Sequence, residues 1–151
     1  VATMDDLKEI EKGYKMYKTI FNYIRHDYIV RKILAGEMFF DEGIVFAVKR
    51  FKKNTRIGTF CASKGDWHNN QMLNMNEGNG AGRRFLDKFL DEYVKDDKYI
   101  CCIRDDNPRS ISWHLRYGMK RVGDINWKNG EIPGGVYAIQ KNAPLNIEEL
   151  L

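Results

Sequence analysis

The chain has 151 residues, with 25 Lys and Arg against 21 Asp and Glu, which gives a formal net charge of +4. This length suits one domain, and 43% apolar residues are enough to bury a core, which excludes a disordered chain. The longest apolar runs span only four or five residues, whereas a membrane span needs about 20. Three cysteines cannot make a disulfide framework. We therefore expect a single cytoplasmic domain over residues 1–151, with no signal peptide, membrane span or metal site.

The first third of the chain is predicted to be helical. Apolar residues recur at steps of three and four residues over 5–24, which is the spacing of one helix face. Gly13 falls inside this pattern and is expected to interrupt or loosen the helix, because glycine there costs about 1 kcal/mol relative to alanine. A second apolar pattern, over 28–34, ends before Gly36, a residue that suits a left-handed helix cap.

The pattern then changes to strands. Two apolar runs separated by Asp41-Glu42-Gly43 predict a strand, a tight turn and a second strand over 38–48. Further turn residues separate a third predicted strand, over 57–62, from a fourth of uneven pattern, over 67–75. The middle of the chain is therefore predicted to be an antiparallel meander.

The second half alternates helices and strands. Apolar residues over 85–94 follow the stripe of a helix that packs on a sheet. The run over 99–103 has no polar alternation and predicts a central strand buried on both faces. Pro108 opens a helix that runs to about Tyr117. Two strands and a short helical turn follow, over 119–127, 135–140 and 145–151. This order predicts a mixed α+β domain around one central sheet.

A glycine-rich turn, Glu77-Gly78-Asn79-Gly80-Ala81-Gly82-Arg83-Arg84, lies between a strand and a helix. Such a turn exposes backbone N–H groups at the positive end of the helix dipole, where a phosphate binds well. Its glycines let a diphosphate approach the main chain, and its two arginines add charge. The dinucleotide pattern GxGxxG fails because its third glycine falls at Arg83, and the Walker pattern GxxxxGK[ST] also fails. The alternative is a tight turn that binds nothing.

Two spaced motifs resemble the GNAT N-acetyltransferase superfamily. The glycine-rich turn occupies the frame of that family's acetyl-CoA loop, Arg/Gln-x-x-Gly-x-Gly/Ala, with Glu77 where the family usually has Arg or Gln. The segment 107–119 follows a predicted buried strand and matches the family's Asn-x-x-Ala-x-x-Leu-Tyr-x-x-x-Gly-Phe block. The residues in frame are Asn107, Ser110, Trp113, Gly118 and Met119. The resemblance covers roughly residues 40–127 and implies an α/β fold with a central, mostly antiparallel, splayed sheet flanked by helices.

The resemblance implies transfer of an acetyl group from acetyl-CoA to an amine by direct attack, with no metal. The cofactor-binding residues that it implies are Leu73, Asn74, Met75, Asn79, Gly80, Ala81, Gly82, Arg83, Arg84 and Asn107. The stretch 73–75 would supply main-chain amides to the pantetheine arm and the thioester. His114 stands where the family usually has a tyrosine that protonates the leaving thiolate, and a histidine could do the same near neutrality. Tyr117 is the second candidate acid, and the alternative is that His114 only packs on its helix.

The base and the acceptor are less defined. Asp66, His68 and Glu37 are candidate bases near predicted strand ends, although such residues are more often turn or surface residues. A small-molecule amine, a protein lysine or N-terminus, and a nucleobase amine, as in phage enzymes of this fold that modify DNA bases, all stay open as acceptors. The basic stretch 49–56 could hold nucleic acid, but a solvated sheet edge is the commoner case. A non-catalytic CoA- or nucleic-acid-binding module is the competing class, and the tail 145–151 could cap an apolar surface or contact a second subunit in a homodimer.

Overall fold

A computed structural model of the chain describes residues 1–17 and 24–141. The predicted helical turn over 145–151 and part of the first predicted helix lie outside these residues. The chain divides into two compact units. The first unit comprises Val1–Lys49 and Asn70–Lys88, and the second comprises Arg50–Asn69 and the chain from Phe89 onward.

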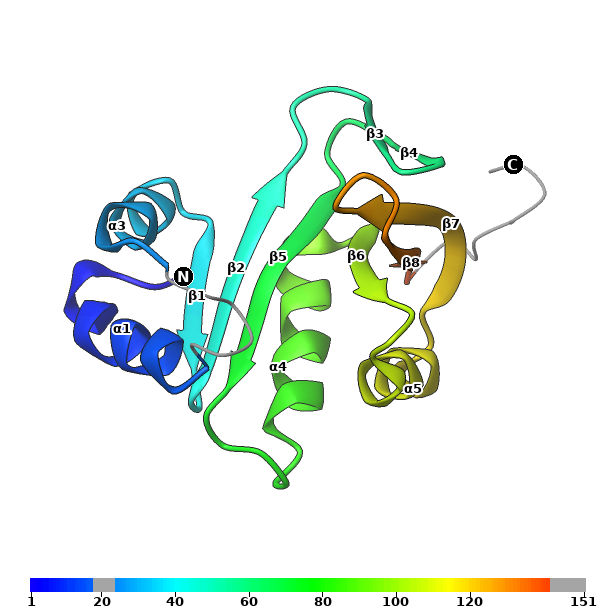
Figure 1. The fold of residues 1–151 in the computed structure, drawn as a ribbon. Helices are drawn as coiled ribbons and strands as arrows, with labels where there is room; N and C mark the ends of the chain where they lie inside the picture. Colours follow the sequence, from blue (N-terminus) through cyan, green and yellow to red (C-terminus); the bar gives the residue numbers. More distant parts are fainter. Residues whose placement is uncertain (18–23, 142–151) are drawn as a thin grey trace. The chain divides into compact units, whose positions relative to one another are not determined.

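The strands confirm the predicted mixed α+β fold with a mostly antiparallel sheet (Figure 1). The six strands of this sheet are β1 (Met38–Asp41), β2 (Ile44–Arg50), β5 (Trp67–Asn74), β6 (Tyr99–Arg104), β7 (Lys120–Trp127) and β8 (Ile132–Ile139). They are hydrogen-bonded in the order β1-β2-β5-β6-β8-β7. The pairs β1–β2, β6–β8 and β7–β8 are antiparallel. The pair β5–β6 is parallel, with Trp67 opposite Tyr99 and His68 opposite Ile100.

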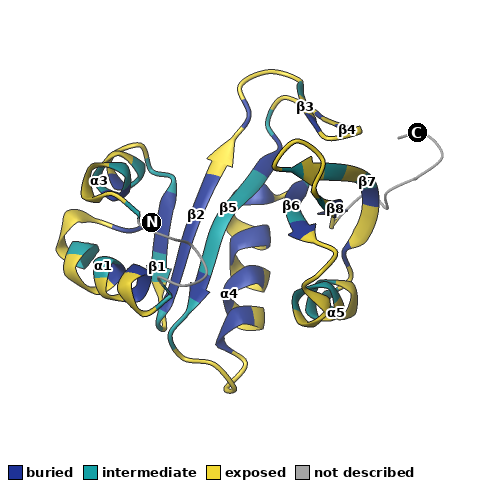
Figure 2. Ribbon diagram, viewed as in Figure 1, coloured by how far each residue is buried: buried dark blue, intermediate teal, exposed yellow. Residues whose placement is uncertain are grey.

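In the first unit, helices cover both faces of the strands. Helices α1 (Leu7–Met16) and α3 (His26–Leu34) pack on one face. The buried residues of this layer are Ala2, Ile10, Tyr14, Ile29, Ile33, Met38, Val45, Ala47 and Leu73. Phe46 points to the other face, where its ring meets Phe85 of α4 (Ala81–Phe89) with centroids 5.2 Å apart. Figure 2 shows the buried side of α4 and the buried length of β2.

Helix α1 continues through Gly13, so the predicted interruption there is wrong. A Cβ atom at this position would lie 3.2 Å from the sulfur of Met75 and 3.3 Å from a methyl group of Val45. Glycine therefore lets α1 approach the strands closely. The close apolar packing of α1 on these strands outweighs the helix-propensity cost of about 1 kcal/mol.

In the second unit, the predicted third strand is in fact a hairpin. The strand expected over 57–62 is replaced by β3 (Thr55–Ile57) and β4 (Phe60–Ala62), which pair antiparallel. Gly58 between them has a φ of +57°, a conformation that favours glycine and reverses the chain. The hairpin is attached to β7 by Thr59 and Asp124, which exchange two hydrogen bonds of 2.8 Å.

The remaining elements of the second unit agree with the predictions. In β6, Tyr99, Ile100, Cys101 and Ile103 are buried, as expected for a central strand. A π-helical turn over Leu90–Val94 precedes this strand. Helix α5 (Pro108–Tyr117) ends at Gly118, whose φ is +116°. Among the described residues, no helix has the length and apolar character that crossing a membrane requires.

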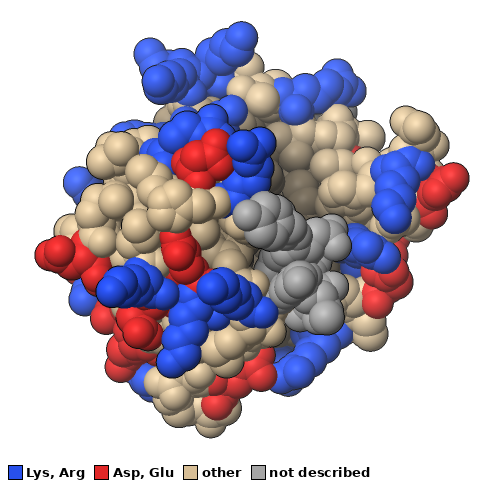
Figure 3. Space-filling view, turned by 60° about the vertical axis from the view of Figure 1, so that its left-hand side comes forward, with Lys and Arg blue, Asp and Glu red and all other residues tan. Residues whose placement is uncertain are grey.

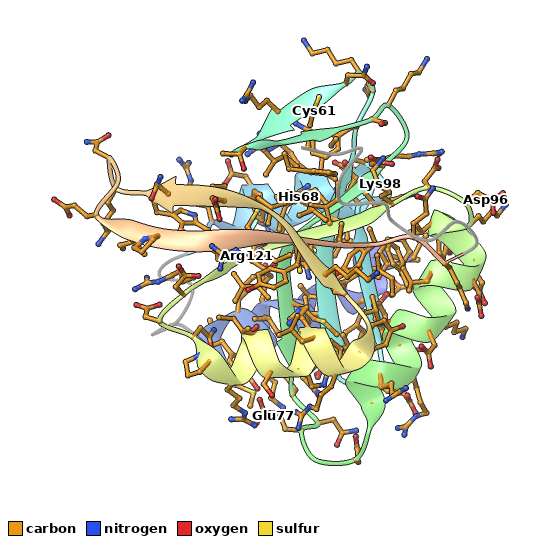
Figure 4. The ribbon with its side chains drawn as sticks, turned by 90° about the vertical axis from the view of Figure 1, so that its right-hand side faces the viewer. Cys61, His68, Glu77, Asp96, Lys98 and Arg121 are labelled. Carbon is orange, nitrogen blue, oxygen red and sulfur yellow. The ribbon has the colours of Figure 1, made fainter. Side chains whose placement is uncertain are left out.

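The three cysteines have different surroundings. All are free thiols, and Cys61 is exposed on β4, as Figure 4 shows. Cys101 is buried in β6 and Cys102 is half-buried. Burial raises the pKa of the Cys101 thiol, and it raises the pKa of Cys102 to about 11. Both β6 thiols are therefore protonated near neutrality and act as small apolar side chains.

Candidate active site

The glycine-rich turn leads into α4 within the first unit. Gly78 and Gly80 have φ values of +89° and +79°, which glycine adopts without strain. The side-chain oxygen of Asn79 accepts the N–H of Ala81 at 3.1 Å. The Arg84 guanidinium donates to the carbonyl oxygen of Asn79 at 2.8 Å. The turn thus combines the positive end of a helix with a cation held against its backbone, an arrangement that suits a phosphate group.

Two carboxylates belong to the turns of this part of the first unit. Glu77, the residue that departs from the family motif, is exposed and is labelled in Figure 4 by the turn that leads into α4. Glu42, in the turn between β1 and β2, has a carboxylate oxygen 3.4 Å from Nε of Arg84. Exposed ion pairs of this kind contribute only about 0–1 kcal/mol. An anionic ligand can therefore displace Glu42 from Arg84 at little cost.

The predicted main-chain donors over 73–75 are not equivalent. The N–H of Met75 donates to the carbonyl oxygen of Gly43 at 2.9 Å. Successive backbone N–H groups in a strand point to opposite edges, so the N–H of Asn74 is directed away from Gly43 and that of Leu73 toward the same edge as Met75. The hydroxyl of Tyr17 donates to the carbonyl oxygen of Asn74. Asn74 is thus the residue of the three whose N–H points to the edge opposite Gly43.

His114 is held by its own helix. Its Nδ1 lies 2.6 Å from the carbonyl oxygen of Ser110. Because a carbonyl oxygen only accepts, Nδ1 carries the hydrogen, and Nε2 of the neutral ring is an acceptor. Burial lowers the pKa of His114 from its ordinary 6.5, an effect that the Ser110 carbonyl partly opposes. Near neutral pH this ring is poised to accept a proton at Nε2 before it can donate one.

The other α5 residues of the predicted site have structural contacts. The Tyr117 ring stacks on Trp113 with centroids 5.4 Å apart and planes 9° apart. Asn107 caps the helix, because its side-chain oxygen accepts the N–H of Ser110 at 3.2 Å. The oxygen of Asn107 is therefore engaged, and its side-chain nitrogen is the group with which it would contact a ligand.

Asp66, one of the predicted bases, forms the centre of a buried network. It accepts the N–H of Ser63 at 2.8 Å and the N–H of Lys98 at 3.0 Å. The Lys98 ammonium lies 3.1 Å from Oδ2, the oxygen that also accepts the Ser63 N–H, and the Asp66 side chain is only 3% exposed. A carboxylate so completely engaged has a structural role, which connects the turn before β5 with the start of β6.

The two other candidate bases also have partners. Nε2 of His68 lies 3.8 Å from the sulfur of Cys102, and its ring stacks on Phe51 with centroids 6.0 Å apart. Glu37 has a carboxylate oxygen 3.6 Å from the ammonium of Lys32. Neither arrangement singles out a base.

The predicted basic stretch is exposed in part. Lys52, Lys53 and Arg56 are exposed, and Figure 3 shows Lys and Arg side chains, without Asp or Glu, at the top of the view. Arg50 is engaged within the second unit, since it lies 3.5 Å from Asp97 and 5.4 Å from the ring centre of Trp67. Nucleic-acid binding by this stretch stays a prediction.

Strand β5 contains a polar run to which the sequence motifs did not point. His68, Asn69, Asn70 and Gln71 are consecutive and all half-buried. A central strand usually carries apolar side chains, so four polar residues in succession are a signal of function that the sequence already contained. Each of them has a hydrogen-bonding partner from another element.

Lowering the pH is expected to destabilise the second unit through His114. The folded state disfavours the charged ring, so below pH 6.5 the unfolded chain binds more protons than the folded one. Stability therefore falls as the pH drops through 6.5, and the loss levels off below the lowered folded-state pKa. Denaturant unfolding between pH 5 and 7.5 should show that the free energy of unfolding depends less steeply on pH in His114→Asn than in the unmodified protein. An equal pH dependence of the free energy of unfolding in His114→Asn and in the unmodified protein would contradict the expectation.

Comparison with solved structures identifies the fold. A GNAT-family acetyltransferase from Streptococcus agalactiae has a TM-score of 0.68 at 14% identity, over 95% of this chain and 94% of that chain. A GNAT-family acetyltransferase from Bacillus cereus has a TM-score of 0.67 at 15% identity, over 94% of this chain and 95% of that chain. Arabidopsis thaliana NAA60 in complex with acetyl-CoA has a TM-score of 0.62 at 9% identity, over 90% of this chain and 95% of that chain. No family model matches the sequence, and a search of curated proteins finds no match. The chain has the fold of the GNAT N-acetyltransferase superfamily, as the two motifs predicted.

Proposed function

We propose that this protein is an N-acyltransferase that moves the acetyl group of acetyl-CoA to an amine. The observation that carries the proposal is the glycine-rich turn of a GNAT fold, with positive φ at Gly78 and Gly80 and the Arg84 guanidinium held at the start of α4. Backbone donors and a cation at a helix start suit the diphosphate of CoA. NAA60, a protein of the same fold, holds acetyl-CoA in its solved structure.

The chemistry follows from the groups described. The N–H of Asn74 would donate to the thioester carbonyl oxygen and stabilise the negative charge that develops when the amine attacks the carbonyl carbon. As the carbon–sulfur bond breaks, the amine loses one proton and the leaving thiolate takes up one. In the second unit, His114 and Tyr117 are the two candidates for the proton transfer to the thiolate.

Acetyl-CoA is expected to raise the melting temperature of the protein, because a ligand at 100 times its Kd stabilises the folded state by about 2.7 kcal/mol. The variant Gly80→Ala should bind about tenfold more weakly, since its Cβ would lie 3.1 Å from the Arg84 guanidinium, at a φ of +79°. Gly36→Ala is the matched control, because Gly36 has a φ of +71° and open space around it. It should share the backbone strain but keep the affinity.

Release of the CoA thiol then separates a catalyst from a binding module. Thiol formation that depends on an added amine supports the acyltransferase. If the protein binds acetyl-CoA but releases no thiol with any added small amine, peptide or nucleobase, it belongs to the non-catalytic class. The absence of acetyl-CoA binding would refute both the acyltransferase and a CoA-binding module.

A further inference from the structure

Two half-buried amides of β5 that belong to the first unit, Asn70 and Gln71, have no role in the proposed mechanism. Asn70 is held from α3, since its side-chain oxygen accepts the Lys32 ammonium at 2.9 Å. An ammonium group has donors only, so the oxygen of Asn70 must face Lys32. The NH₂ group of Asn70 is therefore directed away from that lysine.

The orientation of the Gln71 side-chain amide is likewise fixed, by two tyrosines. Its side-chain oxygen accepts the hydroxyl of Tyr28 at 3.1 Å and the hydroxyl of Tyr14 at 3.3 Å. An amide oxygen has two lone pairs, and both are used here. As for Asn70, the NH₂ group lies on the side of the amide away from these donors.

The residues that orient these amides are themselves held firmly. The Lys32 side chain is only 13% exposed, and its ammonium also donates to the carbonyl oxygen of Val48 at 2.7 Å. Burial lowers the pKa of Lys32 and raises the pKa of both Tyr14 and Tyr28. All three shifts indicate a surrounding of low polarity, where a hydrogen bond gains strength. Lys32, Tyr14 and Tyr28 are thus positioning residues that fix two amides with their NH₂ groups turned away from the lysine and the two tyrosines.

Resting on the proposed acyl transfer, we propose that Asn70 and Gln71 donate hydrogen bonds to carbonyl or carboxylate oxygens of the acceptor. Such a subsite favours an acceptor that carries these oxygens over a polyamine, which has only nitrogen groups. Two sources share this chemistry, a free amino acid and the N-terminal segment of a peptide.

The spacing along β5 favours the peptide. Three residues separate Gln71 from Asn74, which is about 10 Å at 3.3 Å per residue. A free amino acid holds its carboxylate carbon two bonds, about 2.5 Å, from its amine. An extended peptide advances about 3.3–3.6 Å per residue, so the carbonyl carbon of its third residue lies about 9–10 Å from the amine and reaches this span. The proposed acceptor is therefore the amine of a peptide N-terminus.

The test compares tetraalanine amide, free alanine and spermidine as acceptors, by thiol release from acetyl-CoA. The variants Asn70→Asp and Gln71→Glu keep the oxygens that Lys32 and the tyrosines need but replace the NH₂ donors by acceptors. Each should raise the KM for tetraalanine amide about tenfold, leave the KM for acetyl-CoA unchanged and lower the KM for spermidine. Asn126→Asp, at an exposed position of β7, adds the same charge and should change none of these values.

The outcomes separate this inference from the proposed function. Equal KM values for alanine and tetraalanine amide, or no change in the two β5 variants, would overturn the subsite and leave acyl transfer standing. A titration of the CoA-bound protein with tetraalanine amide, followed by the side-chain NH₂ signals of Asn70 and Gln71 in NMR spectra, gives a reading without turnover. Shifts of these signals with no thiol release would support the subsite and refute the acyltransferase. No shift would overturn the subsite, whether or not thiol is released.

Discussion

Replacing Asp66 by alanine is expected to lower the free energy of unfolding by about 3–5 kcal/mol, the cost of removing one partner from a buried ion pair. The change leaves the Lys98 ammonium, whose side chain is only 13% exposed, without its carboxylate. It also leaves the N–H groups of Ser63 and Lys98 without an acceptor, and a buried donor without a partner is costly. Urea unfolding at neutral pH measures the loss.

The control for this prediction is Asp106→Ala. Asp106 lies 2.5 Å from the Arg104 guanidinium, but its side chain is 60% exposed. Water replaces an exposed partner, so the urea concentration at the midpoint of unfolding should be close to that of the unmodified protein. Equal midpoints for Asp66→Ala and Asp106→Ala would show that the Asp66 network contributes little.

Replacing Gly58 by alanine is expected to cost about 2–4 kcal/mol, from backbone strain and overlap together. Gly58 has a φ of +57°, and a Cβ there would lie 2.0 Å from the carbonyl oxygen of Asp124. That oxygen accepts the N–H of Thr59, so the hairpin and β7 cannot both keep their places. Hydrogen exchange should show faster exchange at Thr59 and Asp124, and urea unfolding gives the loss of stability.

The variant Gly130→Ala separates the cost of backbone strain from the cost of overlap between the added Cβ and a neighbouring atom. Gly130 has a φ of +91° but nothing within 4 Å of its position for a Cβ, so it should lose only the strain of about 1–2 kcal/mol. If both variants lost the same free energy, the close approach of Gly58 to β7 would have no measurable effect.

Much of the fold could be predicted because its signals are local. The apolar run over 99–103, Pro108 and Gly118 each determine structure within a few residues of themselves. Gly13 and Gly58 could not be interpreted in this way. Their role is to let distant residues approach, Met75 in one case and Asp124 in the other, and no local pattern identifies such partners.

The candidate site also has features that are local in the sequence and contacts that join distant residues. The glycine-rich turn could be predicted because its backbone N–H groups and arginines are adjacent in the sequence. The contacts of Asp66 with Lys98 and of Gln71 with Tyr14 join residues 32 and 57 positions apart, so only the folded chain shows them. The uneven pattern of the strand over 67–75 was visible in the sequence, but its partners were not.

The unequal exposure of the three thiols has a practical consequence. Cys101 and Cys102 are protonated and screened within β6, whereas Cys61 is exposed on β4. A maleimide dye should therefore attach to the native protein at Cys61 alone. The fluorescence of that single label would report directly on attachment and release of the β3–β4 hairpin, with no cysteine needing to be removed by mutation.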